Sequence, residues 1–216
     1  MSRQEIALPW RDTGEEWRLL HLTHLIQHYG KDFDIILADP LGDFNRSAAR
    51  NSGVDQTQSD VAVIIDADNF IALDQIHKAI EIARNDDVMV KPFQTFGYLT
   101  EEATLRYYLD EVPVFDNNPG IFQSPTSDNF SGGAYVCKKT VWSKIGGADE
   151  NFKGWGGEDD AIHLSCSFYG VPIVYVPGYD YHLYHPANRQ VSKENLDLLF
   201  GKYVNRVETD EIYIPD

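Results

Sequence analysis

A run of small and β-branched apolar side chains stops abruptly at two carboxylates, Asp66 and Asp68. Residues 61–65 are all valine, alanine or isoleucine, which predicts a strand buried on both faces, as in a parallel sheet covered by helices. Such sheets bind their ligands outside the carboxyl ends of the strands. Since alternate side chains of an extended segment point the same way, we expect both carboxylates to face one site and Ala67 to face away.

Two carboxylates that face one site predict a bound cation. Hard divalent ions such as Mg²⁺ and Mn²⁺ take oxygen ligands, and they commonly use one or two carboxylates together with the phosphates of a nucleotide. An isolated Asp-x-Asp is also typical of a strand end whose acids are simply solvated. The choice between these two interpretations depends on the rest of the chain.

The length of 216 residues suits a single α/β domain that buries a core without disulfides. The formal net charge of −16 is spread along the chain, which argues against duplex nucleic acid as a partner. An anionic small ligand would need a local cluster of arginines or a metal ion. We expect Cys137 and Cys166 to be free and buried, as in a reducing compartment. Because the sequence has no secretory signal and no apolar run long enough to span a bilayer, we expect a soluble, cytoplasmic protein.

Strand and helix patterns alternate along the first half of the chain. Their short connections predict a doubly wound α/β fold, a mainly parallel Rossmann-like sheet with helices on both faces. Glycine, proline, asparagine and serine are frequent between residues 113 and 128, so we expect a long functional loop there. Residues 191–207 predict a closing helix that packs on the sheet or on a partner subunit of a homo-oligomer. The predicted strands are 5–8, 33–39, 61–65 and 88–90, and the predicted helices are 15–29, 44–53 (ended by Gly53), 73–83 and 100–109.

Three glycine pairs follow the predicted loop, at 132–133, 146–147 and 156–157. Glycine lets the backbone approach a ligand closely, and tight turns are the alternative explanation. The third pair is preceded by Trp155 and followed by three acids at 158–160. An aromatic face can pack against a pyranose ring, and a carboxylate can accept a proton from an attacking hydroxyl. Acids in a first helical turn are also favoured by the helix dipole alone.

Four motifs carry a resemblance to a known enzyme family: Ser131-Gly132-Gly133, Trp155-Gly156-Gly157-Glu158-Asp159-Asp160, Phe44-Asn45-Arg46 and Asp66-Ala67-Asp68. With them the chain resembles the GT-A glycosyltransferases, in particular the β-1,4-galactosyltransferase and family-2 relatives. The likeness extends from Pro9 to His182. It implies a single GT-A catalytic domain over 1–216, with a nucleotide-binding half at about 1–70, a metal and acceptor half at about 71–190, and a C-terminal helix and tail at about 191–216.

The resemblance also implies a reaction, the metal-dependent, inverting transfer of a hexose or N-acetylhexosamine from a UDP-sugar to a hydroxyl of a carbohydrate or other acceptor. Asp159 corresponds to the base that deprotonates the acceptor, and Glu158 to an acid that orients it. Asp68 is matched to the metal and the donor diphosphate, with Asp66 near the metal or the ribose. The donor-binding residues that the resemblance implies are Pro9, Trp10, Arg11, Phe44, Arg46, Asp66, Gly133 and Trp155.

The resemblance implies that a late histidine completes the metal shell. His182 is the expected ligand, and His185 in the same segment is the alternative. Imidazole beside carboxylates suits Mn²⁺ better than Mg²⁺, so Mn²⁺ is the expected ion. Without the resemblance, a histidine at an aromatic strand end is more often a core residue than a ligand.

Two other functions compete with this hypothesis. A phosphohydrolase of the haloacid-dehalogenase type also carries Asp-x-Asp after an apolar strand, but its first aspartate lies near the start of the chain, whereas Asp66 follows two βα units. That class also leaves Trp155 and His182 without a role. A non-catalytic nucleotide-sugar binding protein would not need Asp159. The chain lacks the amino-terminal anchor and stem of the animal galactosyltransferases, so the expected acceptor is cytoplasmic.

Overall fold

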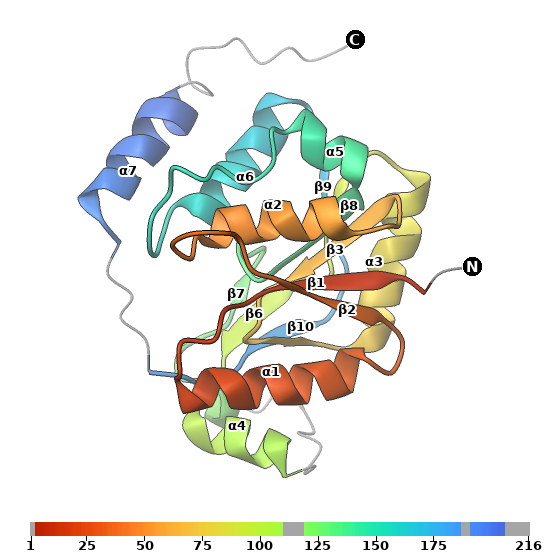
Figure 1. The fold of residues 1–216 in the computed structure, drawn as a ribbon, viewed down its shortest axis with the longest axis vertical. Helices are drawn as coiled ribbons and strands as arrows, with labels where there is room; N and C mark the ends of the chain where they lie inside the picture. The colour runs from red at the N-terminus through yellow and green to blue at the C-terminus, as the bar shows by residue number, and fades with distance from the viewer. Residues whose placement is uncertain (1–2, 110–118, 187–190, 206–216) are drawn as a thin grey trace.

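The computed structural model describes residues 3–109, 119–186 and 191–205. Its main sheet contains, in spatial order, β2 (Asp34–Ala38), β1 (Glu5–Pro9), β3 (Val61–Ile65), β8 (Ala134–Lys138), β5 (Met89–Lys91) and β9 (Ile173–Tyr175) (Figure 1). β1 is parallel to β2 and β3, and β5 is parallel to β9, whereas β8 runs antiparallel to β3 and β5. The predicted mainly parallel sheet is confirmed. The apolar pattern does not reveal that β8 runs in the opposite direction.

Helices cover both faces of the main sheet. One face is covered by α1 (Glu16–Tyr29) and α3 (Leu73–Asn85), and the other by α2 (Arg46–Gln56), α5 (Lys139–Lys144) and α6 (Glu158–Phe168) (Figure 1). Alternation along β3 produces these two layers. Val61, Val63 and Ile65 pack in the first layer, whereas Ala62 and Ile64 pack in the second. The predicted helices on both faces are therefore confirmed.

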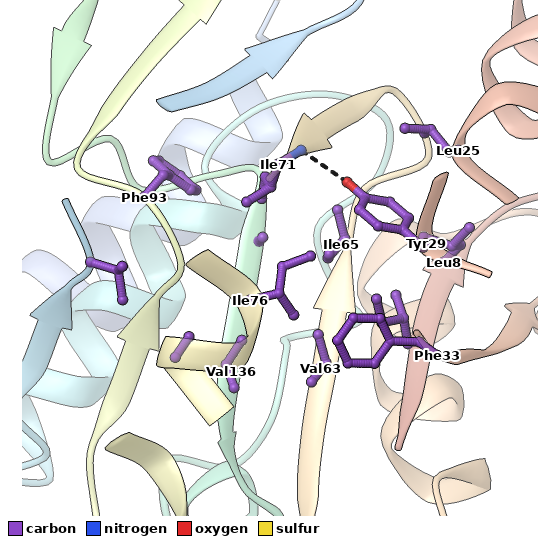
Figure 2. Close-up of a cluster of buried hydrophobic side chains, with 14 of the residues drawn as sticks. Leu8, Leu25, Tyr29, Phe33, Val63, Ile65, Ile71, Ile76, Phe93 and Val136 are labelled. Atoms are coloured by element: carbon purple, nitrogen blue, oxygen red, sulfur yellow. Dashed lines mark hydrogen bonds between the residues drawn. The ribbon is translucent and has the colours of Figure 1, made fainter. Parts of the chain in front are cut away.

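Tyr29 on α1 joins the first core layer to the chain that follows β3. Its ring is completely buried, and Figure 2 shows it beside Leu8 and Leu25. The hydroxyl donates a hydrogen bond to the Asn69 carbonyl (2.7 Å). It accepts one from the Ile71 amide (3.1 Å), which Figure 2 shows as a dashed line. Because a buried hydroxyl needs such partners, these bonds fix β4 (Asn69–Ile71) against the core.

A second sheet brings the end of the chain to the Asp-x-Asp segment. In spatial order it contains β4, β10 (Tyr179–His182), β6 (Thr95–Tyr98) and β7 (Ser127–Asp128). β10 is antiparallel to β4, and His182 is paired with Asn69. The Leu183 amide then donates to the Asp68 carbonyl (2.7 Å). This sheet was not predicted, because its strands are short and carry no continuous apolar run.

The helix after β2 differs from its prediction at the C-terminal end. It was predicted to stop at Gly53, but α2 continues to Gln56. Gly53 faces the sheet, where an added Cβ would lie 2.6 Å from the Ala7 Cβ. The glycine therefore permits close packing of α2 on β1 and does not end the helix. The start of α2 is capped by Asn45, whose side chain accepts a hydrogen bond from the Ala48 amide (2.9 Å).

The segment after β6 is only partly the predicted loop. α4 (Glu101–Tyr108) confirms the predicted helix, and Thr100 caps it by accepting from the Ala103 amide (3.2 Å). The 3₁₀ turn η1 (Pro119–Ile121) and β7 then give structure to the second half of the predicted loop. Residues 110–118 lie outside the described residues.

The closing segment is helical within the described residues, and its helix begins at Lys193 and not at residue 191. It consists of α7 (Lys193–Leu199) and the π-helical turn η2 (Phe200–Val204), and residues 206–216 lie outside the described part. Leu199 packs with Phe152 and Ala161, so α7 lies on α6 (Figure 1). The prediction that this helix packs on the sheet is wrong, because α6 already covers that face. Packing on a partner subunit stays a prediction.

Within the described ranges, no helix is long and apolar enough to cross a bilayer. Cys137 on β8 and Cys166 on α6 are free and buried in the second core layer. The prediction of two free, buried cysteines is therefore confirmed.

Candidate active site

A cavity of about 380 Å³ opens at the carboxyl ends of β1 and β3. Its walls come from these two strand ends, the start of α1, the 130–133 segment, the start of α6 and the end of β10. The predicted site residues that line it are Pro9, Trp10, Phe44, Arg46, Asp66, Asp68, Gly133, Trp155, Glu158, Asp159, His182 and His185. The fold therefore gathers residues from three distant parts of the sequence into one cavity.

The chain turns immediately after β3. The Asp66 amide donates to the Gly133 carbonyl (2.9 Å), and the Asn69 amide donates to the Asp66 carbonyl (3.0 Å). Residues 66–68 are therefore not extended, and the strand alternation expected for them is wrong. Ala67 lines the cavity together with both acids. The two carboxylates take different partners.

Asp68 lies beside both candidate histidines. Its Oδ2 is 3.6 Å from His182 Nε2 and 3.3 Å from His185 Nε2, and one ligand atom from each residue lies within 4.8 Å of the others. Each Nδ1 faces a backbone carbonyl, Leu183 at 2.9 Å and Pro186 at 3.2 Å. A carbonyl only accepts, so Nδ1 carries a proton and Nε2 of each ring faces Asp68, where a neutral ring would offer its Nε2 lone pair to a cation. Burial would raise the pKa of Asp68, but the two imidazoles outweigh it and hold that pKa below its usual range. These three residues could hold a divalent cation.

Asp66 lies outside that cluster, because its carboxylate is paired with a buried arginine. Arg50 on α2 is completely buried, and its Nη2 donates to both carboxylate oxygens of Asp66 (3.0 and 2.8 Å). Its Nη1 donates to Asp159 Oδ1 (2.7 Å). Sequence reasoning missed Arg50. A signal was present, because Arg46 and Arg50 are one helical turn apart, and Arg46 pairs with Glu158.

Asp159 keeps one oxygen available. Its Oδ1 accepts hydrogen bonds from Arg50 and from the Tyr135 hydroxyl (2.7 Å). Its Oδ2 makes no hydrogen bond with the described residues and lies beside Gly132, where an added Cβ would be 2.8 Å away. Burial opposes ionisation of Asp159, but Arg50 and then Arg46 outweigh it and lower its pKa to about 2. Asp159 is therefore ionised at neutral pH.

Comparison with known proteins gives two family matches, and no curated protein matches the sequence. Residues 21–110 match the model of glycosyl transferase family 2, and residues 122–186 match the N-terminal domain of galactosyltransferase. The chain belongs to the GT-A glycosyltransferases. The two matches meet in the cavity, since Asp66 and Asp68 lie in the first and Asp159, His182 and His185 in the second.

Solved structures share the fold of this glycosyltransferase at low sequence identity. The catalytic domain of Drosophila β1,4-galactosyltransferase 7 in complex with xylobiose is 16% identical, with a TM-score of 0.53, covering 90% of this chain and 78% of that one. GalNAc-T7 with UDP, GalNAc and Mn²⁺ is 14% identical, with a TM-score of 0.56, covering 95% of this chain and 41% of that one.

The acidic Glu158 and the aromatic Trp155 line the cavity of the glycosyltransferase near the start of α6. Glu158 is 3% exposed, and its two oxygens accept from Arg46 and from the Gly156 amide (2.9 Å). Burial, then the charge of Asp159, raises the pKa of Glu158. Trp155 is 37% exposed at the rim. The buried Asn195 of α7 holds this loop by donating to the Gly156 carbonyl (2.9 Å).

Arg11 is the predicted donor-binding residue that the structure does not place on the cavity wall. Its guanidinium donates to Asp39 Oδ1 (2.7 Å) and to the Gly42 carbonyl (2.5 Å). It also lies 5.7 Å from the centre of the Phe44 ring. The acidic 39–43 loop engages the side chain, and direct donor contact by Arg11 stays a prediction. Arg11 instead supports Phe44, which lines the cavity.

We expect Arg50→Gln to destabilise the enzyme by about 3–5 kcal/mol, because it leaves Asp66 and Asp159 without their buried cation. Urea unfolding measures the effect. Arg106→Gln is the control, since Arg106 makes an exposed pair with Glu102 whose loss should cost less than about 1 kcal/mol. Equal losses in the two variants would contradict the structural role of Arg50.

Gly133 forms the floor of the cavity in a left-handed conformation (φ 88°). An added Cβ would lie 2.3 Å from Asp180 Oδ2, which is buried and hydrogen-bonded to the Asn69 side chain. We expect Gly133→Ala to destabilise the protein by about 2–3 kcal/mol. Gly146→Ala is the matched control, because Gly146 has a similar φ (84°) and no atom within 4 Å of an added Cβ. It should lose only about 1–2 kcal/mol in the same unfolding assay. An equal loss in both variants would contradict the close contact.

Proposed function

We propose that the protein is a metal-dependent, inverting glycosyltransferase that moves a hexose or N-acetylhexosamine from a UDP-sugar to an acceptor hydroxyl. One observation carries the proposal. The Asp68, His182 and His185 cluster lines the same cavity as Asp159, which keeps one oxygen without a hydrogen bond from the described residues. A cation site and a base at one cavity are the two groups that displacement of a nucleoside diphosphate requires.

The proposed metal is Mn²⁺, held by Asp68, His182 and His185. One carboxylate and two imidazoles offer an oxygen and two nitrogen donors, a set that suits Mn²⁺ better than Mg²⁺. The similar GalNAc-T7 structure contains UDP and Mn²⁺. When bound, such a cation neutralises the charge that develops on the departing diphosphate. Asp66, held by Arg50, is proposed to contact the ribose.

The donor nucleotide is proposed to bind at the end of β1. Pro9, Trp10 and Phe44 line that side of the cavity. Trp10 Nε1 is buried and makes no hydrogen bond with the described residues, so a ligand acceptor group would satisfy it. In this arrangement the nucleotide half, at about 1–70, supplies Asp68 and the 71–190 half supplies both histidines.

Asp159 is proposed to act as the base on the acceptor side. The acceptor oxygen forms a bond to the anomeric carbon, the bond to the UDP oxygen breaks, and the hydroxyl proton moves to Asp159 Oδ2. A carboxylate with a pKa of about 2 is a weak base toward a free hydroxyl. The hydroxyl becomes strongly acidic as its oxygen bonds to carbon, so the proton transfers late in the displacement. A single displacement inverts the anomeric centre.

The sugar acceptor is proposed to lie against Trp155, with Glu158 positioned beside it. The ring lines the cavity and is partly exposed, which suits packing of a pyranose. The related Drosophila enzyme was crystallised with xylobiose. Two buried free cysteines fit a reducing compartment, so a cytoplasmic acceptor is part of the proposal.

The alternative phosphohydrolase fits the geometry less well. Its first aspartate would have to attack a phosphate, but both oxygens of Asp66 accept hydrogen bonds from the buried Arg50. A non-catalytic binder would bind UDP without turnover.

A donor screen tests the proposal. A panel of UDP-sugars is incubated with Mn²⁺ and an aryl xyloside, and UDP release and product configuration are measured by NMR. We expect one sugar nucleotide to be consumed and its α-linked sugar to appear β-linked. Retained configuration would contradict the role of Asp159, and release of inorganic phosphate would favour the hydrolase.

A further inference from the structure

Arg18, in the first turn of α1, lines the same cavity but has no role in the function proposed above. We propose that Arg18 binds the diphosphate of the nucleotide donor, beside the Asp68, His182 and His185 cluster. The inference rests on the proposed function, and it adds a residue that neither the motifs nor the family matches point to.

The charge of the cavity wall carries the argument. Five described carboxylates line it, at Asp66, Asp68, Glu158, Asp159 and Asp160, against two permanent cations, Arg18 and Arg46. Arg46 forms an ion pair with Glu158, and Arg50, which is buried behind the wall, forms ion pairs with Asp66 and Asp159. The whole chain carries a net charge of −16. A doubly charged anion therefore enters a negative field, and it needs a cation that no carboxylate already neutralises.

Arg18 is such a cation. It makes no hydrogen bond or ion pair with the described residues, and its Nε is buried without a partner. Buried N–H donors are rarely left unsatisfied in folded proteins, so this one calls for a ligand. The planar guanidinium donates two parallel hydrogen bonds to phosphate oxygens, a geometry that lysine does not offer.

Arg18 also lies at the metal end of the cavity. Arg18 and His21 are three residues apart on the same face of α1, and both line the cavity. The rings of His21 and His185 are 6.0 Å apart. Arg18 is thus near the cluster that would hold the cation of a metal diphosphate. Asp159, the proposed base, is instead bound by Arg50 of α2.

The test compares ligands that differ only in phosphate. Dissociation constants of UDP and uridine are measured at saturating Mn²⁺ for the wild type, Arg18→Gln, Arg18→Lys and the control Arg84→Gln, whose arginine is exposed on α3. We expect Arg18→Gln to weaken UDP binding roughly tenfold or more and to leave uridine binding within about twofold. Arg18→Lys should lose less UDP affinity, because lysine keeps the positive charge but not the two parallel hydrogen bonds of the guanidinium.

Each result decides a different claim. Unchanged UDP affinity in Arg18→Gln, or equal losses for UDP and uridine, would overturn the role of Arg18 while the proposed function stands. A wild-type protein that binds no UDP with Mn²⁺ would overturn the proposed function, and this inference with it.

Discussion

Asp159→Asn is expected to lower the rate of sugar transfer by about 10²–10⁴-fold, while UDP affinity stays within about twofold. Asparagine keeps the shape of the side chain but cannot take the proton of the acceptor hydroxyl. Oδ2 is the oxygen that could accept this proton in the wild type, since Oδ1 already accepts hydrogen bonds from Arg50 and Tyr135. Initial rates of transfer and calorimetric titration of UDP measure the two quantities.

Asp160→Asn is the matched control for this prediction. Asp160 is the next residue of α6, lines the same cavity and accepts a hydrogen bond from the Ser131 hydroxyl (2.9 Å). The Asp160→Asn variant loses the same charge, but Asp160 is not the proposed base. The transfer rate of this variant should therefore fall by less than about tenfold. Thermal unfolding of both variants confirms that each is folded. Equal loss of UDP binding and transfer in Asp159→Asn, or equal rates in the two variants, would contradict the base.

Asp68→Asn is expected to raise the Mn²⁺ concentration needed for half-maximal UDP binding by about 100-fold or more. The carboxylate is the only anionic donor of the described cluster, and without it two neutral imidazoles remain. Manganese titration followed by electron paramagnetic resonance measures free and bound ion directly.

Histidine variants extend the same experiment to the question that the sequence left open. His182→Ala and His185→Ala should each weaken Mn²⁺ binding, because both Nε2 atoms face Asp68. His77→Ala is the control, since its ring is exposed, is paired with Asp32 and does not line the cavity. A loss confined to one of the two histidines would identify that one as the ligand. Unchanged affinity in Asp68→Asn would exclude this cluster as the metal site.

The main sheet and its covering helices were predictable from the sequence, because buried strands and amphipathic helices leave periodic apolar patterns. The run at residues 61–65 gave β3 to the residue. The second sheet was not predictable, since β4 and β10 are short and their pairing joins residues more than a hundred positions apart. That pairing decides which histidines meet Asp68.

The site residues that belong to a motif were predictable from the sequence. The site residue that is recognised only by its buried contacts was not. The Asp-x-Asp and Trp-Gly-Gly-Glu-Asp segments indicated the cavity walls, and all of these acids line it. Arg50 carries no motif of its own, and only its contacts with Asp66 and Asp159 reveal its importance. Arg11 is the opposite case, because it matches a family segment but the structure places it beside Asp39 and not on the cavity wall.

Calorimetric titration of UDP into the purified protein, first with Mn²⁺ and then with EDTA, tests the central claim most directly. If Asp68, His182 and His185 hold the ion that binds the diphosphate, UDP will bind with Mn²⁺ and its affinity will fall by at least about tenfold in EDTA. Equal affinity in both conditions would contradict a metal-dependent donor site. Absence of binding in both would contradict UDP as the nucleotide.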